Sequence, residues 1–289
     1  MEQATKTTTK TQNISQTIED IEIKLLLYAI YQRYGYDFQD YSYSSQQRRL
    51  KDILKKYNLN FFSELQNMIL RDENFFSQVL CDMTITVSEF FRDPEIYKAL
   101  REHITDELKT YPHIKIWHAG CATGEEVYSM AILLKEEKLY DKAQIYATDI
   151  NTRALNKAKK GINSSNSFTK ASEQYFMAGG KESLSNYYSA DDKSVLIAPS
   201  LHKNIVFSDH NLVSDSKFGE MNLILCRNVL IYFNKDLQNR ALKLMADSLV
   251  PGGFLVLGTK ESITFTDIAK DFEKFCDKEK IYRKRWKSS

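Results

Sequence analysis

Residues 114–126 read Ile-Lys-Ile-Trp-His-Ala-Gly-Cys-Ala-Thr-Gly-Glu-Glu, and this stretch decides the fold class. It begins with a short apolar run of the kind that forms a buried strand. A turn that contains Gly120 and Gly124 follows at once, and a helix is predicted from Glu125. In open α/β sheets, ligands bind beyond the carboxyl ends of the strands, where glycines let the backbone approach a ligand closely. We therefore expect a strand, a ligand-binding turn and a helix.

The same alternation continues toward the C-terminus. The expected strands are residues 145–148, 205–207, 223–226 and 254–257, and the expected helices are residues 152–160 and about 235–249, the latter closed by Pro251-Gly252-Gly253. Apolar strands that alternate with helices are typical of a mostly parallel sheet with helices on both faces. The chain is therefore predicted to have an α/β fold.

The N-terminal part has a different pattern. Residues 1–14 are rich in Thr, Lys and Gln and have almost nothing to bury, so we expect a disordered tail. Residues 15–85 carry apolar side chains at helical spacing, which predicts a small helical domain. The first such positions are Ile18, Ile21, Leu25 and Tyr28. The helix that contains them should end at Gly35.

Residues 86–289 are assigned to the sheet domain, which opens with a helix. Asp93 is a good N-cap and Pro94 suits the first helical position, so the helix should start there. Residues 162–204 break the alternation of strands and helices, since they are rich in Ser, Asn and Tyr. We expect an inserted antiparallel β module in that segment, with one strand at residues 194–197.

Glu125 and Glu126, in the first turn of the helix after the glycine turn, indicate which ligand is bound. A pyrophosphate needs the positive end of a helix free of anions, and the turn lacks the Gly-Lys-Ser/Thr ending of a phosphate-binding loop. Acidic groups suit a cationic sulfonium that also carries amino-acid and ribose donors, as S-adenosylmethionine does. The alternative is that the two carboxylates only complement the helix dipole.

Asp149 follows the second predicted strand, 25 residues after Gly124. An acidic residue at this place ordinarily binds ribose hydroxyls in dinucleotide-binding folds as well. Asp149 therefore fits both NAD and a methyl donor, and it could also cap the next helix. The two glutamates favour the methyl donor.

Polar side chains leave the sheet where the fourth predicted strand ends. Arg227, Asn228 and Tyr232 follow residues 223–226 among apolar neighbours. Because buried polar groups need partners, we favour a functional role over a packing motif with one surface arginine. Arg92 follows two aromatic residues at the entry to the sheet domain, where its guanidinium fork would match a carboxylate. The alternative for Arg92 is an ion pair within a domain junction.

The bulk composition narrows the cellular setting. The net charge of the 289 residues is +2, so the whole-chain charge gives no reason to expect nucleic acid as a partner. The four cysteines form no Cys-x-x-Cys pair, and we expect neither a metal site nor disulfides. The N-terminal residues look like neither a signal peptide nor a membrane anchor. From these features we expect a cytoplasmic protein that does not insert into membranes.

Several unusual strings occur in a fixed order along about residues 20–285. They are Phe90-Phe91-Arg92-Asp93-Pro94, Ala119-Gly120-Cys121 with Thr123-Gly124-Glu125-Glu126, Thr148-Asp149-Ile150, Cys226-Arg227-Asn228-Val229-Leu230-Ile231-Tyr232-Phe233 and Pro251-Gly252-Gly253. In this order they resemble the CheR family of chemotaxis-receptor methyltransferases. The resemblance implies a Rossmann-like class I methyltransferase sheet that uses S-adenosylmethionine, a small N-terminal helical domain and an inserted antiparallel β module.

The resemblance also implies which residues bind S-adenosylmethionine and its product, S-adenosylhomocysteine. Glu126 and Asp149 would hold the amino-acid and ribose parts. The other cofactor-binding residues would be Thr86, Ser88, Arg92, Gly120, Asn211, Leu212, Arg227 and Asn228. Thr86 and Ser88 stand where the family usually has Asn and Thr, and both keep the capacity for hydrogen bonds. No metal is implied.

The implied reaction is the methylation of glutamate side chains on chemotaxis receptors. A glutamate carboxyl group has an ordinary pKa of about 4.3, so it is ionised at neutral pH and needs no general base. The five histidines form no recognisable catalytic group in the sequence, which agrees with this. Catalysis would come from holding oxygen, carbon and sulfur in line. We assign Arg92 to orienting the acceptor carboxylate and Tyr232 to positioning the methyl region.

The implied partner is the cytoplasmic helical bundle of a chemotaxis-type receptor. Residues 43–57, a predicted helix, would steer association with an acidic receptor helix, because they carry five basic residues and one acid. The basic residues are Arg48, Arg49, Lys51, Lys55 and Lys56. A solvated helix face is the alternative. Other functions that stay open are methylation of another protein or a small acid, a scaffold that binds S-adenosylmethionine without catalysis, and a nicotinamide dehydrogenase.

Overall fold

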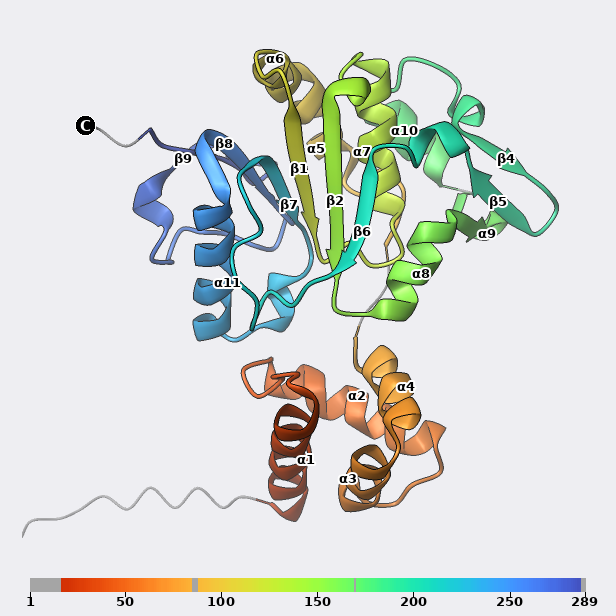
Figure 1. Cartoon of the computed structure of the whole chain (residues 1–289), viewed down its shortest axis with the longest axis vertical. Coiled ribbons are helices and arrows are strands. Elements are labelled where there is room, and N and C mark those ends of the chain that lie inside the picture. Colours follow the sequence, from red (N-terminus) through yellow and green to blue (C-terminus); the bar gives the residue numbers. More distant parts are fainter. Residues whose placement is uncertain (1–16, 85–87, 169, 287–289) are drawn as a thin grey trace, which may run out of the picture.

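The computed structural model describes residues 17–84, 88–168 and 170–286. Figure 1 shows a group of four helices at the N-terminal side and a larger domain in which helices flank a sheet. The expected α/β fold with a helical N-terminal domain is confirmed. The expected tail, residues 1–14, lies outside the described residues.

The helical domain consists of α1 (Ile18–Tyr34), α2 (Tyr43–Lys56), α3 (Phe62–Arg71) and α4 (Glu73–Met83). A capping box starts α1, in which the Thr17 hydroxyl accepts from the Asp20 N–H and the Asp20 carboxylate accepts from the Thr17 N–H. The helix ends as predicted at Gly35, whose φ of +76° is a left-handed conformation that glycine adopts at little cost.

The apolar stripe that predicts α1 is not the face that α1 buries. The buried face consists of Ile23, Leu26, Leu27 and Ile30. The predicted stripe is exposed to 80, 44, 54 and 52% at Ile18, Ile21, Leu25 and Tyr28, in that order. The prediction of a helix is correct and its expected core face is wrong. Both sides of α1 are apolar, and the period of 3.6 residues alone cannot say which side meets the rest of the domain.

The sheet domain is built on seven strands. They are β1 (Ile114–Ala119), β2 (Ala143–Asp149), β6 (Ile205–Asp209), β7 (Met221–Cys226), β8 (Leu249–Leu257), β9 (Phe272–Cys276) and β10 (Ile281–Lys284). Their order is β6-β2-β1-β7-β8-β10-β9, with parallel pairing from β6 to β8 and antiparallel pairing of β10 with both of its neighbours. The chain runs from β1 outward to β6 and then returns to β7, on the other side of β1. This switch point is where open α/β sheets bind ligands.

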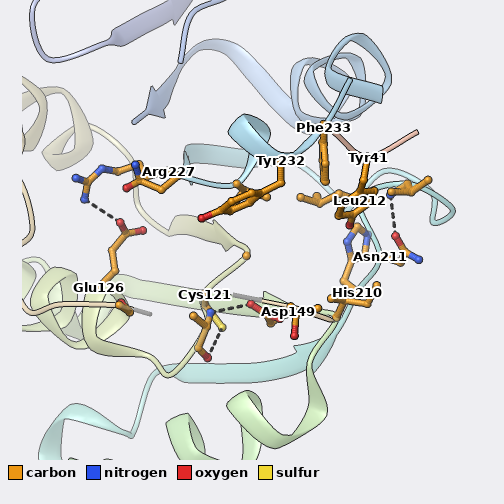
Figure 2. A pocket seen from close by; sticks show the side chains of 18 of the residues that line it. Tyr41, Cys121, Glu126, Asp149, His210, Asn211, Leu212, Arg227, Tyr232 and Phe233 are labelled. Atoms are coloured by element: carbon orange, nitrogen blue, oxygen red, sulfur yellow. Dashed lines mark hydrogen bonds and ion pairs between the residues drawn. The ribbon is translucent and has the colours of Figure 1, made fainter. Parts of the chain in front are cut away.

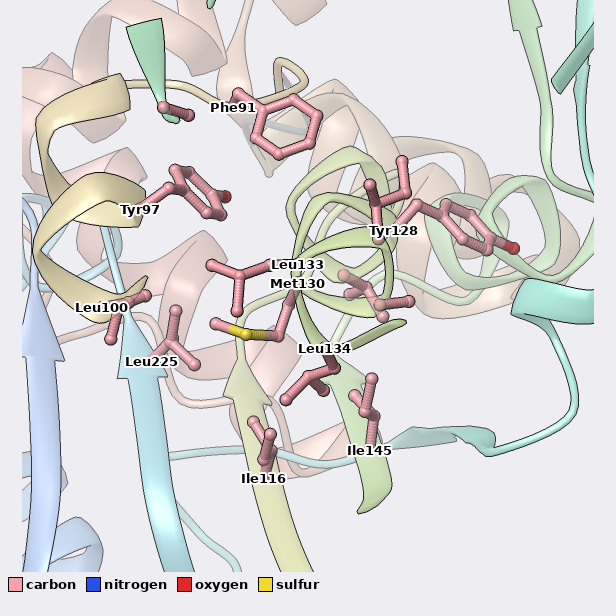
Figure 3. Close-up of a cluster of buried hydrophobic side chains, with 14 of the residues drawn as sticks. Phe91, Tyr97, Leu100, Ile116, Tyr128, Met130, Leu133, Leu134, Ile145 and Leu225 are labelled. Atoms are coloured by element: carbon pink, nitrogen blue, oxygen red, sulfur yellow. The ribbon is translucent and has the colours of Figure 1, made fainter. Parts of the chain in front are cut away.

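Helices cover both faces of this sheet. They are α5 (Pro94–Ala99), the π-helical turn η1 (Leu100–Ile104), α6 (Thr105–Lys109), α7 (Glu125–Glu136), α8 (Thr152–Lys160) and α11 (Lys235–Ser248), with short 3-10 turns at η2 (Tyr140–Lys142), η4 (Pro199–Leu201), η5 (Leu230–Tyr232) and η6 (Ala269–Asp271). Figure 3 shows the core under α7, where Met130 and Leu134 pack among strand residues such as Ile116. A second core lies under α11 and includes Leu242 and Met245. The two cores fix β1 and β7 from both sides.

The segment Pro251-Gly252-Gly253 corrects one sequence-based expectation. It lies inside β8 and does not separate a helix from a strand. Leu249 pairs with Met221 and Phe254 pairs with Leu223, so residues 250–253 bulge out of the ladder. The φ of Gly252 is +78°, which explains why glycine stands in the bulge.

The inserted module contains β3 (Ile162–Ser164), α9 (Ser165–Phe168), α10 (Ala171–Met177), η3 (Leu184–Tyr187), β4 (Tyr188–Ala190) and β5 (Ser194–Ile197). Its three strands form a separate antiparallel sheet in the order β3-β5-β4. The expected antiparallel module and the expected strand at residues 194–197 are confirmed.

A buried network of charged side chains fastens this module to the sheet domain, and we call it the anchor network. Arg101 of η1 pairs with Glu136 of α7, and its Nη1 lies 2.9 Å from Oε1 of Glu137. Nζ of Lys181, in the module, lies 2.9 Å from Oε2 of Glu137. The hydroxyl of Tyr175 in α10 donates to Glu136. The C-terminal end of α7 therefore holds the module through paired charges.

Candidate active site

A cavity of about 250 Å³ lies at the switch point, beyond the carboxyl ends of β1, β2 and β7. Figure 2 shows side chains from several loops pointing into it. All the predicted site residues that the structure describes line it, namely Ser88, Arg92, Gly120, Glu126, Asp149, Asn211, Leu212, Arg227, Asn228 and Tyr232. The eleventh, Thr86, lies outside the described residues.

The glycine turn after β1 touches the loop after β7. The φ of Gly120 is +80°, and a Cβ atom there would lie 2.5 Å from Cγ2 of Val229. The N–H groups of Gly120 and Cys121 both donate to the Thr148 carbonyl at 2.8 Å. Glycine is therefore needed both for the backbone conformation and for the close approach of the two loops.

Asp149 joins the glycine turn to the end of β2. Its Oδ2 accepts from the Ala122 N–H at 2.8 Å, and its Oδ1 accepts from the Asn151 N–H at 2.8 Å. Burial raises the pKa of Asp149 above its ordinary value. The side chain of Asn151 caps α8 by accepting from the Ala154 N–H at 3.0 Å. Asp149 is therefore not the helix cap that the sequence left open.

Glu126 belongs to a second group of charged side chains, which we call the cavity network. Its Oε1 lies 2.9 Å from Nδ1 of His118, and its Oε2 accepts from Nη1 of Arg227 at 2.8 Å. Nη2 of Arg227 donates to Oδ2 of Asp93 at 2.7 Å and to the Arg92 carbonyl at 2.8 Å. Burial raises the pKa of Glu126, but the charge of Arg227 and the hydrogen bond with His118 outweigh burial and hold this pKa below its ordinary value.

The cavity network contains more negative than positive charge. Glu126 and Asp93 share the single guanidinium of Arg227, so these three side chains together carry a net charge of −1. Among the described residues that line the whole cavity, the three cations Arg49, Arg92 and Arg227 balance the three acids Glu89, Glu126 and Asp149, so the excess negative charge is local to the cavity network. A local negative charge favours a cationic group over a phosphate. The charge balance therefore fits the sulfonium and ammonium groups of S-adenosylmethionine.

The two neighbouring glutamates of α7 differ in what they contact. Glu125 is buried and does not line the cavity, and its carboxylate accepts from the Thr123 hydroxyl at 2.6 Å. Burial raises the pKa of Glu125, whereas the pKa of Glu126 is lowered. Only Glu126 of the pair is placed to meet a ligand.

Two members of the cavity network, His118 and Asp93, are absent from the site residues predicted from the sequence. Asp93 is expected to cap α5, but its side chain makes no capping hydrogen bond and pairs with Arg227 instead. His118 is fully buried near the end of β1. Its place two residues before Gly120, at the end of the strand, is the signal that points to it.

Two guanidinium groups from different domains reach the cavity. The guanidinium carbon of Arg49, in α2, lies 4.8 Å from the centre of the Tyr232 ring, and Nη1 donates to the Met83 carbonyl at 2.5 Å. Nη2 of Arg49 is buried and has no hydrogen-bond partner among the described residues. Arg92 has no ion-pair partner among the described residues. They therefore give no support to the alternative that Arg92 forms an ion pair within a domain junction.

The helical domain also positions the loop that carries Tyr232. The Ser42 N–H donates to the Tyr232 carbonyl at 2.8 Å. Next to it, the rings of Tyr41 and Phe233 meet edge to face, with their centroids 4.9 Å apart. The cavity wall is therefore built by both domains.

His210 also lines the cavity but is badly placed to act as a base. Its Nε2 lies 3.3 Å from the Ser216 carbonyl, which identifies Nε2 as the protonated nitrogen. Nδ1 is buried, and the ring packs edge to face on Trp117 at 5.3 Å. With Nε2 engaged and Nδ1 shielded from solvent, neither ring nitrogen is exposed to a substrate in the cavity.

Among the described residues, no group of three or more His, Cys, Asp and Glu side chains could hold a metal ion. No helix within residues 17–84, 88–168 and 170–286 combines the length and the apolar character that a membrane span requires.

Comparison with known proteins places the chain in a family. Residues 86–280 match the CheR methyltransferase S-adenosylmethionine-binding domain, and residues 21–84 match the CheR methyltransferase all-alpha domain. The chain is 48% identical to a Pseudomonas putida protein named "Putative methyltransferase Cher3", over 93% of this chain and 99% of the relative. It is 30% identical to the "Chemotaxis protein methyltransferase" of Listeria monocytogenes, over 79% of this chain and 85% of the relative. It is also 30% identical to the "Chemotaxis protein methyltransferase 1" of Vibrio cholerae, over 75% and 80%. The chain belongs to the CheR methyltransferase family and carries both the all-alpha and the S-adenosylmethionine-binding domains.

Proposed function

We propose that this protein transfers the methyl group of S-adenosylmethionine to glutamate side chains of a chemotaxis-type receptor and forms glutamate methyl esters. One observation carries the proposal. Two guanidinium groups with donors that have no partner among the described residues, those of Arg92 and Arg49, line the same cavity as Glu126 and Asp149. The cavity thus combines a wall suited to a cationic donor with groups suited to an anionic acceptor.

The residues present fit the cofactor. The cavity network supplies a net negative charge for the amino-acid end, and we assign the carboxylate of Glu126 to the ammonium group. Asp149 would accept hydrogen bonds from the ribose hydroxyls. The adenosine part would be lined by four other cavity residues, Asn211, Leu212, Arg227 and Asn228. Glycine at position 120 lets Val229 pack against the turn, which brings together two loops that line the cavity.

The reaction needs orientation more than acid–base chemistry. When bound, S-adenosylmethionine supplies an electrophilic methyl group, and an oxygen–carbon bond forms as the carbon–sulfur bond breaks. A glutamate carboxylate is already ionised at neutral pH, so the enzyme has no proton to remove. The guanidinium of Arg92 would hold the acceptor carboxylate, and Tyr232 would hold the methyl region, with reacting atoms about 3–3.5 Å apart. The placement of His210 agrees with a reaction that needs no base.

The helical domain would bring the acceptor to the cavity. Of the basic residues of α2, Lys51 pairs with Glu19 at 2.7 Å and Lys56 pairs with Asp82 at 2.6 Å. Arg49 lines the cavity, and Arg48 and Lys55 are exposed and could meet an acidic partner. We infer that α2 lies along an acidic receptor helix and delivers its glutamates past Arg49, which places the protein beside the cytoplasmic part of the receptor.

The test is a methyl-transfer assay with labelled S-adenosylmethionine and a receptor cytoplasmic fragment. We expect label on the fragment that alkali releases, because a carboxyl ester hydrolyses in base and an N-methyl group does not. Arg92→Ala should lower turnover by about 10-fold to 100-fold while calorimetry shows little change in affinity for S-adenosylhomocysteine. Turnover that survives within a few-fold would remove Arg92 from the acceptor site. Base-stable label would point to another acceptor.

A further inference from the structure

Glu261 is a buried carboxylate behind the cavity wall, in the turn that follows β8. Its side chain contacts the loop after β7, and the residue is only 5% exposed. Oε2 accepts from the Gly258 N–H at 2.7 Å and from the Asn228 N–H at 3.0 Å. Oε1 accepts from the Ile231 N–H at 3.3 Å. One side chain thus joins two loops at the carboxyl end of the sheet.

A buried carboxylate ordinarily pairs with a cation, and Glu261 does not. No Lys or Arg of the described residues forms an ion pair with it. Burial raises its pKa, and the backbone N–H groups of Gly258, Asn228 and Ile231 act in the opposite direction. These three N–H groups, together with that of Leu230, compensate the charge, so the carboxylate holds the backbone around it in place.

The loop that Glu261 holds has an unusual backbone. The φ of Asn228 is +60°, a left-handed conformation that costs energy for a residue other than glycine. A Cβ atom at Gly258 would lie 2.7 Å from Oε2 of Glu261 and 2.9 Å from the Asn228 nitrogen. The three groups therefore fit together only when position 258 is glycine and the carboxylate lies between the loops.

The same loop lines the cavity. Arg227, Asn228 and Tyr232 are all cavity residues, and Val229 packs against Gly120 of the glycine turn. The hydrogen bonds from Asn228 and Ile231 to Glu261 lie on the side of this loop that faces the turn after β8. A shift of the loop would move residues that contact the cofactor and, in the proposed reaction, the acceptor.

We propose that Glu261 is a positioning residue, which fixes the loop of residues 227–232 in the shape that binds S-adenosylmethionine. It need not touch the ligand. The expected effect of Glu261 on cofactor binding follows from the assignment of the S-adenosylmethionine-binding domain. Its expected effect on the acceptor, through Tyr232, depends on the proposed function.

The test compares Glu261→Gln with Glu261→Ala. Gln has the same shape but keeps only one accepting oxygen. When that oxygen serves Gly258 and Asn228, the Gln NH₂ group faces the Ile231 N–H, and two donors oppose each other. We expect Glu261→Gln to weaken S-adenosylhomocysteine binding about tenfold and Glu261→Ala to weaken it more, because a loop misplaced by about 1 Å loses its contacts. Calorimetry measures both.

Amide hydrogen exchange separates positioning from a loss of overall stability. In Glu261→Gln, the Ile231 amide should exchange faster while the Asn228 amide stays protected, and in Glu261→Ala both should exchange faster. Glu136→Gln is the matched control, because Glu136 is also a buried carboxylate. It belongs to the anchor network and does not line the cavity. This substitution should lower the melting temperature and leave ligand affinity and both amides unchanged.

Two results would overturn the proposal. One is S-adenosylhomocysteine binding by Glu261→Gln within twofold of the wild type, with unchanged exchange at Ile231. The other is a loss of affinity in Glu136→Gln as large as that in Glu261→Gln, since the loss would then follow stability alone. Neither measurement uses a receptor, so failure of receptor methylation in the wild type would leave this test intact.

Discussion

Helix α7 carries a network of charged side chains at each end, and the two networks differ in their charge balance. At its first turn, Glu126 belongs to the cavity network, where two carboxylates share the guanidinium of Arg227. At its last turn, Glu136 and the adjoining Glu137 belong to the anchor network, where they meet Arg101 and Lys181. The anchor network has two charges of each sign, and the cavity network has an excess of one negative charge.

The difference in charge balance indicates that ion pairs stabilise the fold at one end of α7 and prepare a ligand site at the other. In the anchor network the side chains of Arg101 and Glu136 are 6% and 1% exposed, and the charges are matched. In the cavity network, Nε2 of His118 and Nε of Arg227 have no hydrogen-bond partner among the described residues. A balanced network stabilises the fold, whereas an unbalanced and incompletely partnered one is prepared for a charged ligand.

The largest effect should come from breaking the anchor network. Arg101→Met leaves Glu136 and Glu137 buried without their main cation, and breaking a buried pair in this way costs about 3–5 kcal/mol. Urea unfolding measures the loss. S-adenosylhomocysteine affinity should stay within about twofold under conditions where the variant is folded. A tenfold loss of affinity in the folded variant would show that the two ends of α7 are not separate in function.

The next largest effect should come from the cavity network. Glu126→Gln removes the charge that we assign to the ammonium group, and a charged hydrogen bond contributes about 1.5–3 kcal/mol. We therefore expect S-adenosylhomocysteine affinity to fall by about 10-fold to 100-fold, with a smaller change in unfolding free energy than Arg101→Met causes. The distinction between the two networks would be wrong if Glu126→Gln bound S-adenosylhomocysteine with the affinity of the wild type and lost unfolding free energy instead.

A smaller effect concerns pH. Burial raises the pKa of Asp149, so ionisation costs the folded state more than the unfolded chain. Its contribution to stability therefore falls as the pH rises from about 3.9 through the raised pKa. Ligand affinity changes in the opposite direction and should fall as the pH drops through that pKa, because a protonated carboxyl accepts fewer hydrogen bonds. Calorimetry between neutral and mildly acidic pH checks this.

Two variants show which carboxyl is responsible for the pH dependence. The pKa of Glu125 is also raised by burial, but this residue does not line the cavity. Glu125→Gln should keep the acid-side loss of affinity, and Asp149→Asn should bind more weakly at neutral pH and show no further acid-side loss. The reverse pattern would assign the titration to Glu125.

The smallest effect should come from the rim of the anchor network. Lys181 is 54% exposed although it lies 2.9 Å from Glu137. Exposed ion pairs contribute about 0–1 kcal/mol, so Lys181→Ala should change the unfolding free energy by no more than that. A loss as large as that of Arg101→Met would mean that the network depends on its exposed member.

The sequence predicts those parts of this protein that depend on local pattern. Gly35 ends α1, and residues 194–197 form β5, because a left-handed glycine and a short β-branched run are local signals. The glycine turn after β1 and Asp149 at the end of β2 are predicted to meet at the cavity because parallel strands end at the same edge of a sheet.

Other features depend on contacts between distant segments. Asp93 looks like a helix cap in the sequence, but Arg227 lies 134 residues away along the chain and takes its carboxylate. Glu261 carries no local signal of a partner, and it acquires a role only when the loops after β7 and β8 come together. The buried face of α1 is likewise decided by the helices that pack on it, and not by its own period.

The central claim is carboxylate methylation that needs no general base. Single-turnover transfer of labelled methyl to a receptor fragment, followed as base-labile product between about pH 6 and 9, tests it most directly. We predict a rate that is nearly constant, since the acceptor glutamate is ionised throughout this range. A rate that falls tenfold per pH unit below a pKa near 7, and that loses this dependence in His210→Asn, would contradict the claim.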